Sequence, residues 1–248
     1  DERVVDEHHI SSFPGVEKVM LVLEPYRLAS RETKHERSLV KIGDVTVGGT
    51  EVIMMAGPCA VESEEQMDKA AEGVKRAGAH VLRAGAFKPR TSPHSFQGLG
   101  RQGVLMLEAA GKRHGLPTVS EIMDVRDVDY MCQHIDVLQI GARNMQNFDL
   151  LKEVGKVKKP VVLKRGMSAT VKELLLAAEY ILMNGNQNVI LCERGIRTFE
   201  TETRNTLALA TVPLVHELSH LPIIVDPSHG TGKISLIPTM VRASIAAG

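Results

Sequence analysis

Short apolar runs of four or five residues recur along the chain from residue 52 onward. They show no strict alternation of apolar and polar residues, which is typical of strands covered on both faces of a sheet. A loop with glycine, proline or charged residues follows each run. The predicted strands are residues 52–56, 80–84, 117–120, 137–140, 160–163, 188–192 and 221–225.

Helical patterns fill the gaps between these runs. In the first gap Met67, Ala71 and Val74 recur at helical spacing and would share one face. Pro213 predicts a break in the sixth helix, because proline cannot donate to the helical ladder. The predicted helices cover residues 64–77, 103–114, 125–134, 148–153, 170–183, 200–217 and 236–247.

The alternation of strand and helix predicts the α/β class, with a parallel sheet and crossover helices. We count seven βα units, whereas a (β/α)₈ TIM barrel has eight in about 250 residues. The sequence stops at Gly248, where an eighth strand should begin. We therefore expect a TIM barrel whose eighth βα unit is absent from this sequence.

The region before residue 52 does not follow this pattern. Residues 16–23 alternate partly like a strand, and residues 24–35 are polar and arginine-rich. Residues 41–51 predict a hairpin, with apolar positions spaced by two and Gly48-Gly49 at the turn. Such a hairpin could plug the bottom of a barrel.

Composition excludes several classes of function. The 30 basic and 30 acidic side chains cancel, which argues against nucleic acid or a membrane surface as a partner. No apolar run approaches the roughly 20 residues that span a bilayer, and no signal peptide is visible. The three cysteines are widely spaced and odd in number, which fits a reducing cytoplasm rather than a disulfide framework.

The loop after the second predicted strand combines guanidinium, ammonium and hydroxyl groups within ten residues. Planar forks, a point charge and small donors are what a phosphorylated substrate needs. A solvated basic surface loop is the alternative, and the charges at other strand ends weigh against it. The residues are Arg83, Lys88, Arg90, Thr91 and Ser92.

Charged residues recur at all seven predicted strand ends, and four of these ends present Arg or Lys. The carboxyl ends of barrel strands form the active site, so this clustering favours an anionic substrate with one or two phosphates. The residues at the other ends are Cys59 and Glu62, Glu121, Arg143, Lys164 and Arg165, Glu193 and Arg194, and Asp226 and His229.

Two of these residues, Cys59 and His229, could meet across the barrel mouth and bind a divalent ion such as Zn²⁺, Fe²⁺ or Mn²⁺. A lone cysteine is more often a small buried apolar residue. Two ligands are too few for a stable site, and Glu121, Asp226 and Glu193 are candidates to complete it.

Lys164 should be buried at its strand end, where it could clamp phosphate, form a Schiff base or donate a proton. Its neighbour Arg165 should point to the opposite side of the strand. We therefore favour a clamp or an acid over a Schiff base.

The chain resembles the 3-deoxy-D-arabino-heptulosonate 7-phosphate (DAHP) synthases, and most closely their single-barrel type Iβ branch. The resemblance rests on six motifs that occur in the same order. One of them separates the chain from a sister family: the 3-deoxy-D-manno-octulosonate 8-phosphate synthases carry Lys-Ala-Asn-Arg where this chain has Lys-Pro-Arg-Thr. The motifs are GPCAVES (57–63), LRAGAFKPRTSPHSFQGLG (82–100), QIGARNMQNF (139–148), LKRGM (163–167), ILCERGIRTFE (190–200) and VDPSHGTG (225–232).

The resemblance implies a transferase that condenses phosphoenolpyruvate with erythrose 4-phosphate and releases phosphate, the first step of the shikimate pathway. The resemblance implies that Arg143, Lys164 and Arg194 bind phosphoenolpyruvate, with Arg83 and Lys88 beside them. Arg90, Thr91 and Ser92 would bind the aldose phosphate, and Cys59 and His229 would bind the metal. Lys88 would also donate a proton, and Glu121 and Asp226 would orient these groups or the attacking water.

The family pattern also implies features beyond the site. A divalent metal, most plausibly Mn²⁺ with Fe²⁺, Zn²⁺, Co²⁺ or Cd²⁺ as alternatives, takes further Glu and Asp ligands from positions after Gly248. Residues 1–35 are expected to be the tail and linker of an N-terminal ferredoxin-like regulatory domain, on the similarity of residues 13–32. Residues 36–248 are then the C-terminally incomplete barrel, and the assembly is expected to be a homotetramer.

Two alternatives stay open at this point. The first is octulosonate 8-phosphate synthesis from arabinose 5-phosphate, which an assay with both aldoses separates. The second is a non-catalytic phospho-ligand-binding fragment, which the absent eighth strand makes plausible. It would bind phosphoenolpyruvate without turnover.

Overall fold

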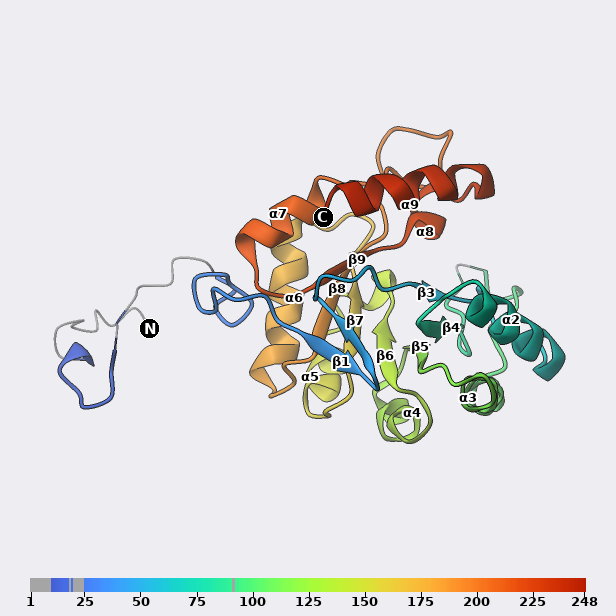
Figure 1. The fold of residues 1–248 in the computed structure, drawn as a ribbon, viewed down its shortest axis with the longest axis horizontal. Coiled ribbons are helices and arrows are strands. Elements are labelled where there is room, and N and C mark those ends of the chain that lie inside the picture. The colour runs from blue at the N-terminus through green and yellow to red at the C-terminus, as the bar shows by residue number, and fades with distance from the viewer. Residues whose placement is uncertain (1–9, 18, 20–24, 91) are drawn as a thin grey trace.

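A computed structural model describes residues 10–17, 19, 25–90 and 92–248. Its main body is a curled parallel sheet with helices packed on the outer face (Figure 1). The strands of this sheet are β3 (Met55–Ala56), β4 (Val81–Arg83), β5 (Thr118–Ile122), β6 (Val137–Ile140), β7 (Val161–Lys164), β8 (Val189–Glu193) and β9 (Ile223–Val225). The helices are α2 (Glu64–Arg76), α3 (Arg101–His114), α4 (Val128–His134), α5 (Phe148–Gly155), α6 (Val171–Met183), α7 (Thr211–Leu218), α8 (Pro227–Thr231) and α9 (Ile237–Ala246).

The seven strands lie side by side in chain order, and each pairs in parallel with the next. This is the arrangement that the alternation of strands and helices predicts, because helical crossovers connect parallel neighbours. Within the described residues, β3 and β9 pair with one neighbour each and not with each other. The fold is thus a barrel-like α/β sheet whose first and last strands are its edges.

A small antiparallel hairpin, β1 (Val40–Ile42) and β2 (Val45–Val47), confirms the predicted hairpin but corrects its turn. The turn lies at Gly43-Asp44, between the paired Ile42 and Val45. Gly48 serves another purpose: its φ is +97°, and a Cβ there would lie 2.5 Å from the Ser38 carbonyl oxygen. Gly48 therefore marks a close backbone approach rather than a hairpin turn, whereas a Cβ at Gly49 would meet nothing within 4 Å.

The hairpin plugs the inside of the sheet. Val40, Ile42 and Val47 are buried and form one apolar cluster with the inward-facing residues of the strands. Those residues are Val81, Val119, Val137, Val162, Ile190 and Cys192. A second cluster, between the outer face of the sheet and the helices, makes up the larger core. The apolar strand runs reflect burial on both faces.

The predicted helix over residues 200–217 is wrong in its first half. Helix α7 begins only at Thr211, and the preceding loop is tied by a bridge between Ile196 and Thr206. Pro213 does not break the helix, because it lies in the first turn, where backbone N–H groups need no intrahelical partner. The loop instead packs on the segment that carries His229, as described below.

The segment that precedes the hairpin, residues 26–38, is strapped onto the outside of the barrel. The carboxylate of Glu179 on α6 accepts hydrogen bonds from the backbone N–H groups of Arg27, Leu28 and Ala29, at 3.0, 2.8 and 2.9 Å. At the end of α7, Ser219 Oγ donates to the Ala29 carbonyl. The strand expected over residues 16–23 lies largely outside the described residues.

Glu179→Ala is expected to lower the free energy of unfolding by about 3 kcal/mol, because it leaves several partly buried N–H donors without their charged acceptor. Urea unfolding measures the change. Glu65→Ala is the matched control: Glu65 is exposed and, within the described residues, pairs only with Lys69, a type of contact worth at most about 1 kcal/mol. Equal losses in the two variants would contradict an anchoring role for Glu179.

Candidate active site

The inward face of the sheet changes from apolar to polar along β4, β5, β6 and β7. Successive side chains alternate between the two faces, so the residue two positions after an inward-facing valine also faces inward. Val81, Val119, Val137 and Val162 contact the hairpin plug, and the inward positions that follow them are polar. Those positions are Arg83, Glu121, Gln139 and Lys164. The carboxyl end of the barrel is therefore a polar layer above an apolar floor.

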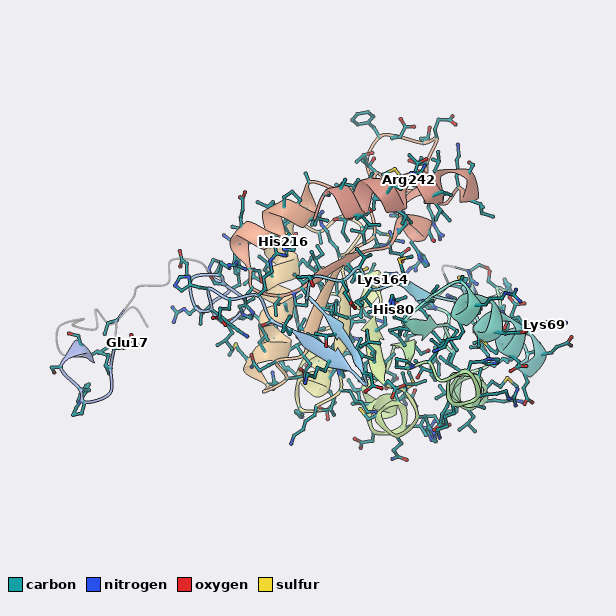
Figure 2. All side chains as sticks on the ribbon, in the orientation of Figure 1. Glu17, Lys69, His80, Lys164, His216 and Arg242 are labelled. Carbon is teal, nitrogen blue, oxygen red and sulfur yellow. The ribbon has the colours of Figure 1, made fainter. Side chains whose placement is uncertain are left out.

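Asp226, directly after β9, connects the centre of this layer to its edge. Its Oδ2 accepts from Lys164 Nζ at 2.5 Å and contacts His229 Nδ1 at 2.7 Å. Burial alone would raise the pKa of Asp226, but the His229 hydrogen bond and the Lys164 charge outweigh it and hold that pKa well below its usual range. Asp226 is therefore an anion that fixes both a lysine and a histidine. Figure 2 shows Lys164 over the middle of the molecule.

Cys59 and His229 are neighbours although they follow the two edge strands. A hydrogen bond with His229, together with the Lys88 and Arg83 charges, lowers the pKa of the Cys59 thiol to about 6. Lys88 Nζ lies 3.2 Å from Cys59 Sγ and donates to the Cys59 carbonyl at 2.9 Å. Cys59 is exposed, which excludes the alternative that it is a small apolar residue buried in the core.

Gly57 lets this loop come close enough. Its φ is +151°, and a Cβ there would lie 2.1 Å from the Arg83 carbonyl oxygen. Lys88 itself is only 6% exposed. Burial, and then the Arg83 charge, lower the pKa of Lys88, which makes it a better proton donor near neutral pH.

The arginines at this end of the barrel lack direct ion pairs, although the charge of Asp226 acts on Arg194 from a distance. Within the described residues Arg83, Arg90, Arg143 and Arg194 form no ion pair, whereas Arg165 on the outer face does. Arg194 is 6% exposed, and its buried Nη1 has no hydrogen-bond partner among the residues that the structure describes. A buried guanidinium with an unused donor is costly unless a ligand satisfies it. The arrangement suits an anionic substrate.

Glu193 is wrong as a candidate metal ligand. It is fully buried on the outer side of β8, where Oε2 pairs with Arg165 Nη1 at 2.8 Å and Oε1 accepts from the Gly195 N–H. This pair also confirms that Arg165 points away from Lys164. Glu121 does face inward, but it accepts from Gln139 Nε2 at 3.2 Å.

The acceptor loop is less constrained than the strand ends. Arg90 Nε donates to the Phe96 carbonyl at 3.3 Å, and Ser92 Oγ accepts from the His94 N–H at 3.4 Å. Both side chains are on an exposed loop, without the buried partners of Lys164. Thr91 lies outside the described residues.

The donor types of Cys59 and His229, thiolate and imidazole, suit a borderline divalent ion. Asp226 on His229 Nδ1 is a common outer partner of a ligating histidine, since it leaves Nε2 for the metal. In the part of the chain that the structure describes, no three His, Cys, Asp or Glu side chains are grouped to enclose an ion. The two residues fit two positions of a metal site.

A family model described as the DAHP synthetase I family matches residues 29–248. This chain belongs to that family. A phospho-2-dehydro-3-deoxyheptonate aldolase from Thermotoga maritima is 48% identical over 248 residues, which is 100% of this chain and 73% of the relative. The structure of a DAHP synthase from the same organism superposes with a TM-score of 0.89, with the same coverage.

Other relatives and structures match this chain at lower identity or over a smaller part of it. The 2-dehydro-3-deoxyphosphooctonate aldolase of Koribacter versatilis is 29% identical over 229 residues, covering 84% of this chain and 81% of the relative. A truncated DAHP synthase from Thermotoga maritima, at 45% identity and TM-score 0.84, covers 90% of this chain and 82% of its own. The heptulosonate branch of the family is therefore much nearer than the octulosonate branch among these relatives.

Sequence reasoning missed Asn205 in this DAHP synthetase I family site. Asn205 is 4% exposed, and its Nδ2 donates to the His229 carbonyl at 2.9 Å. Its backbone N–H donates to the Gly230 carbonyl, and the Arg204 N–H to that of Thr231. The loop before α7 therefore fixes the backbone that carries His229. Its interpretation as helix hid this role.

In metal-free protein, alkylation of Cys59 is expected to be half-maximal near pH 6, because only the thiolate reacts and the fraction of thiolate rises with pH through the pKa. Mass spectrometry of iodoacetamide-treated protein measures the rate against pH. Cys132 is the internal control, since burial raises its pKa. His229→Ala should move the Cys59 midpoint upward; a wild-type midpoint near the ordinary thiol pKa would contradict the contact.

Proposed function

We propose that this protein condenses phosphoenolpyruvate with erythrose 4-phosphate and one water to give DAHP and inorganic phosphate. The observation that carries the proposal is the buried Arg194, which forms no ion pair among the described residues and whose Nη1 has no hydrogen-bond partner there. Two phosphorylated substrates brought together repel each other, and closely placed guanidinium and ammonium groups offset that repulsion. The 48% identical relative named as this aldolase supports the same choice.

The basic strand ends and the exposed loop after β4 suit the two substrates. We assign Arg143, Lys164 and Arg194 to the phosphate and carboxylate of phosphoenolpyruvate, with Arg83 beside them. The exposed loop then receives the aldose phosphate through Arg90, Thr91 and Ser92. Lys164 is held in place by Asp226, so its ammonium is oriented before substrate arrives.

Lys88 is placed to donate a proton. Its buried Nζ contacts the Cys59 carbonyl and thiol. Its lowered pKa favours proton release to the alkoxide that develops on the aldehyde oxygen. Cys59 and His229 would hold a divalent ion, Mn²⁺ by our assignment, which as a Lewis acid polarises the aldehyde carbonyl when bound. Asp226 keeps the His229 ring oriented for that contact.

Phosphate release measured with erythrose 4-phosphate and with arabinose 5-phosphate tests the proposal. Turnover is expected with the four-carbon aldose and Mn²⁺, and is expected to fall when a chelator removes the metal. A preference for the five-carbon aldose would instead support octulosonate synthesis. Binding of phosphoenolpyruvate with no turnover at saturating Mn²⁺ would indicate a non-catalytic binder.

A further inference from the structure

A cleft of about 180 Å³ opens beside the polar layer, among the loops that follow β6, β7 and β8. Its volume is several times the roughly 30 Å³ that one water occupies in the liquid. Arg143 lines it from the first loop, Ser168 from the second and Arg197 from the third. Lys164 and Arg194 do not line it, so the cleft adjoins the substrate site rather than coinciding with it.

The lining of the cleft is cationic and rich in donors. No Asp or Glu is among its lining residues, and within the described chain neither Arg143 nor Arg197 forms an ion pair. The backbone N–H groups of Met167 and Ser168, which also line it, donate to no other described group. The Arg197 N–H donates to the Met167 carbonyl at 2.7 Å, which ties the third loop to the second.

Two guanidinium groups, a hydroxyl and free N–H groups are the donors that bind a phosphate dianion, because each can give a charge-assisted or backbone hydrogen bond to its oxygens. We propose that this cleft is a second phosphate subsite, which receives the inorganic phosphate released by the reaction, and that Arg197 is its principal residue. The role in release rests on the proposed function. Arg143, shared by the cleft and the substrate site, lies where phosphate would pass from one to the other.

Inorganic phosphate titrated into protein saturated with phosphoenolpyruvate, without aldose, tests the subsite. Calorimetry is expected to detect two phosphates bound to the wild type, one at the empty aldose-phosphate site and one in the cleft, and Arg197→Gln should weaken binding in the cleft about tenfold, the loss of one charge-assisted contact. Arg197→Lys should lie between the two. Arg242→Gln is the matched control, because Arg242 lies on the outer helix α9 and, among the described residues, its side chain hydrogen-bonds only to Thr239 (Figure 2). Binding of only one phosphate by the saturated wild type, or unchanged affinity of the cleft in Arg197→Gln, would overturn the proposal.

A second measurement distinguishes free phosphate from the phosphate group of the substrate. Arg197→Gln is expected to leave the KM for phosphoenolpyruvate within about twofold while raising the inhibition constant for inorganic phosphate about tenfold. A parallel rise in both constants would place Arg197 in the substrate site and overturn a separate subsite. Absence of turnover in the wild type would refute the proposed function alone, because the phosphate titration needs no turnover.

Discussion

Replacement of Lys88 by alanine is expected to lower kcat for DAHP formation by about 10²- to 10⁴-fold, the usual range for loss of a general acid. Lys88 is buried, and its Nζ contacts both the carbonyl and the thiol of Cys59. No other described ammonium or imidazole makes both contacts. Steady-state phosphate release with both substrates measures the effect, and the KM for phosphoenolpyruvate should change much less than kcat.

Lys69→Ala is the matched control for this variant. Lys69 is an exposed lysine on α2 whose partner, Glu65, is four residues earlier (Figure 2). It should retain wild-type turnover, which excludes a general effect of losing one positive charge. Full activity in Lys88→Ala, at an unchanged unfolding temperature, would refute the role of Lys88 as proton donor.

Asp226→Asn is expected to have the largest effect on stability. The substitution leaves the buried Lys164 ammonium without its carboxylate, and breaking such a pair costs about 3–5 kcal/mol. At this chain length that loss lowers the unfolding temperature by roughly 10 °C. It should also raise the Mn²⁺ concentration needed for half-maximal activity, because the ring of His229 loses its Nδ1 partner. Thermal unfolding and a metal titration measure the two effects.

The stability effect of Asp226 has a defined pH dependence. Its folded-state pKa is lower than that of the unfolded chain, so the carboxylate stabilises the fold at every pH above about 4. That contribution is lost as the pH falls toward the folded-state pKa, and the gap between wild type and Asp226→Asn should narrow there. Asp127→Asn, which removes an exposed pair with Arg101, is the control and should shift stability by less than about 1 kcal/mol at any pH. A stability difference between wild type and Asp226→Asn that does not change with pH would contradict the contact with Lys164.

Strand ends were predictable because each strand is a short apolar run bounded by polar loops. The alternation along a strand was equally informative: it placed Lys164 inward and Arg165 outward, and the structure confirms both. The same alternation on β8 puts Glu193 outward beside an inward Cys192. Its position at a strand end therefore suggested Glu193 as a metal ligand, but its side chain points away from the site.

Partners across the barrel could not be predicted from the sequence. Lys164 ends β7 and meets Asp226, which follows β9, so the contact passes over the intervening β8. Such a contact depends on how strongly the sheet curls, and sequence periodicity carries no information on curvature. The role of Asn205 was hidden for a related reason. Its loop has polar residues at a spacing compatible with helix, and only packing against the His229 segment decides its structure.

Cys59 follows β3 and His229 follows β9, the two edges of the sheet. A ligand bound by both residues would act as a removable cross-link between the first and last strands. A ligand that binds only the folded form stabilises that form by mass action. Affinity at this site and the stability of the sheet are therefore thermodynamically linked: a change that separates the two edge strands weakens binding, and a bound ligand holds those strands together.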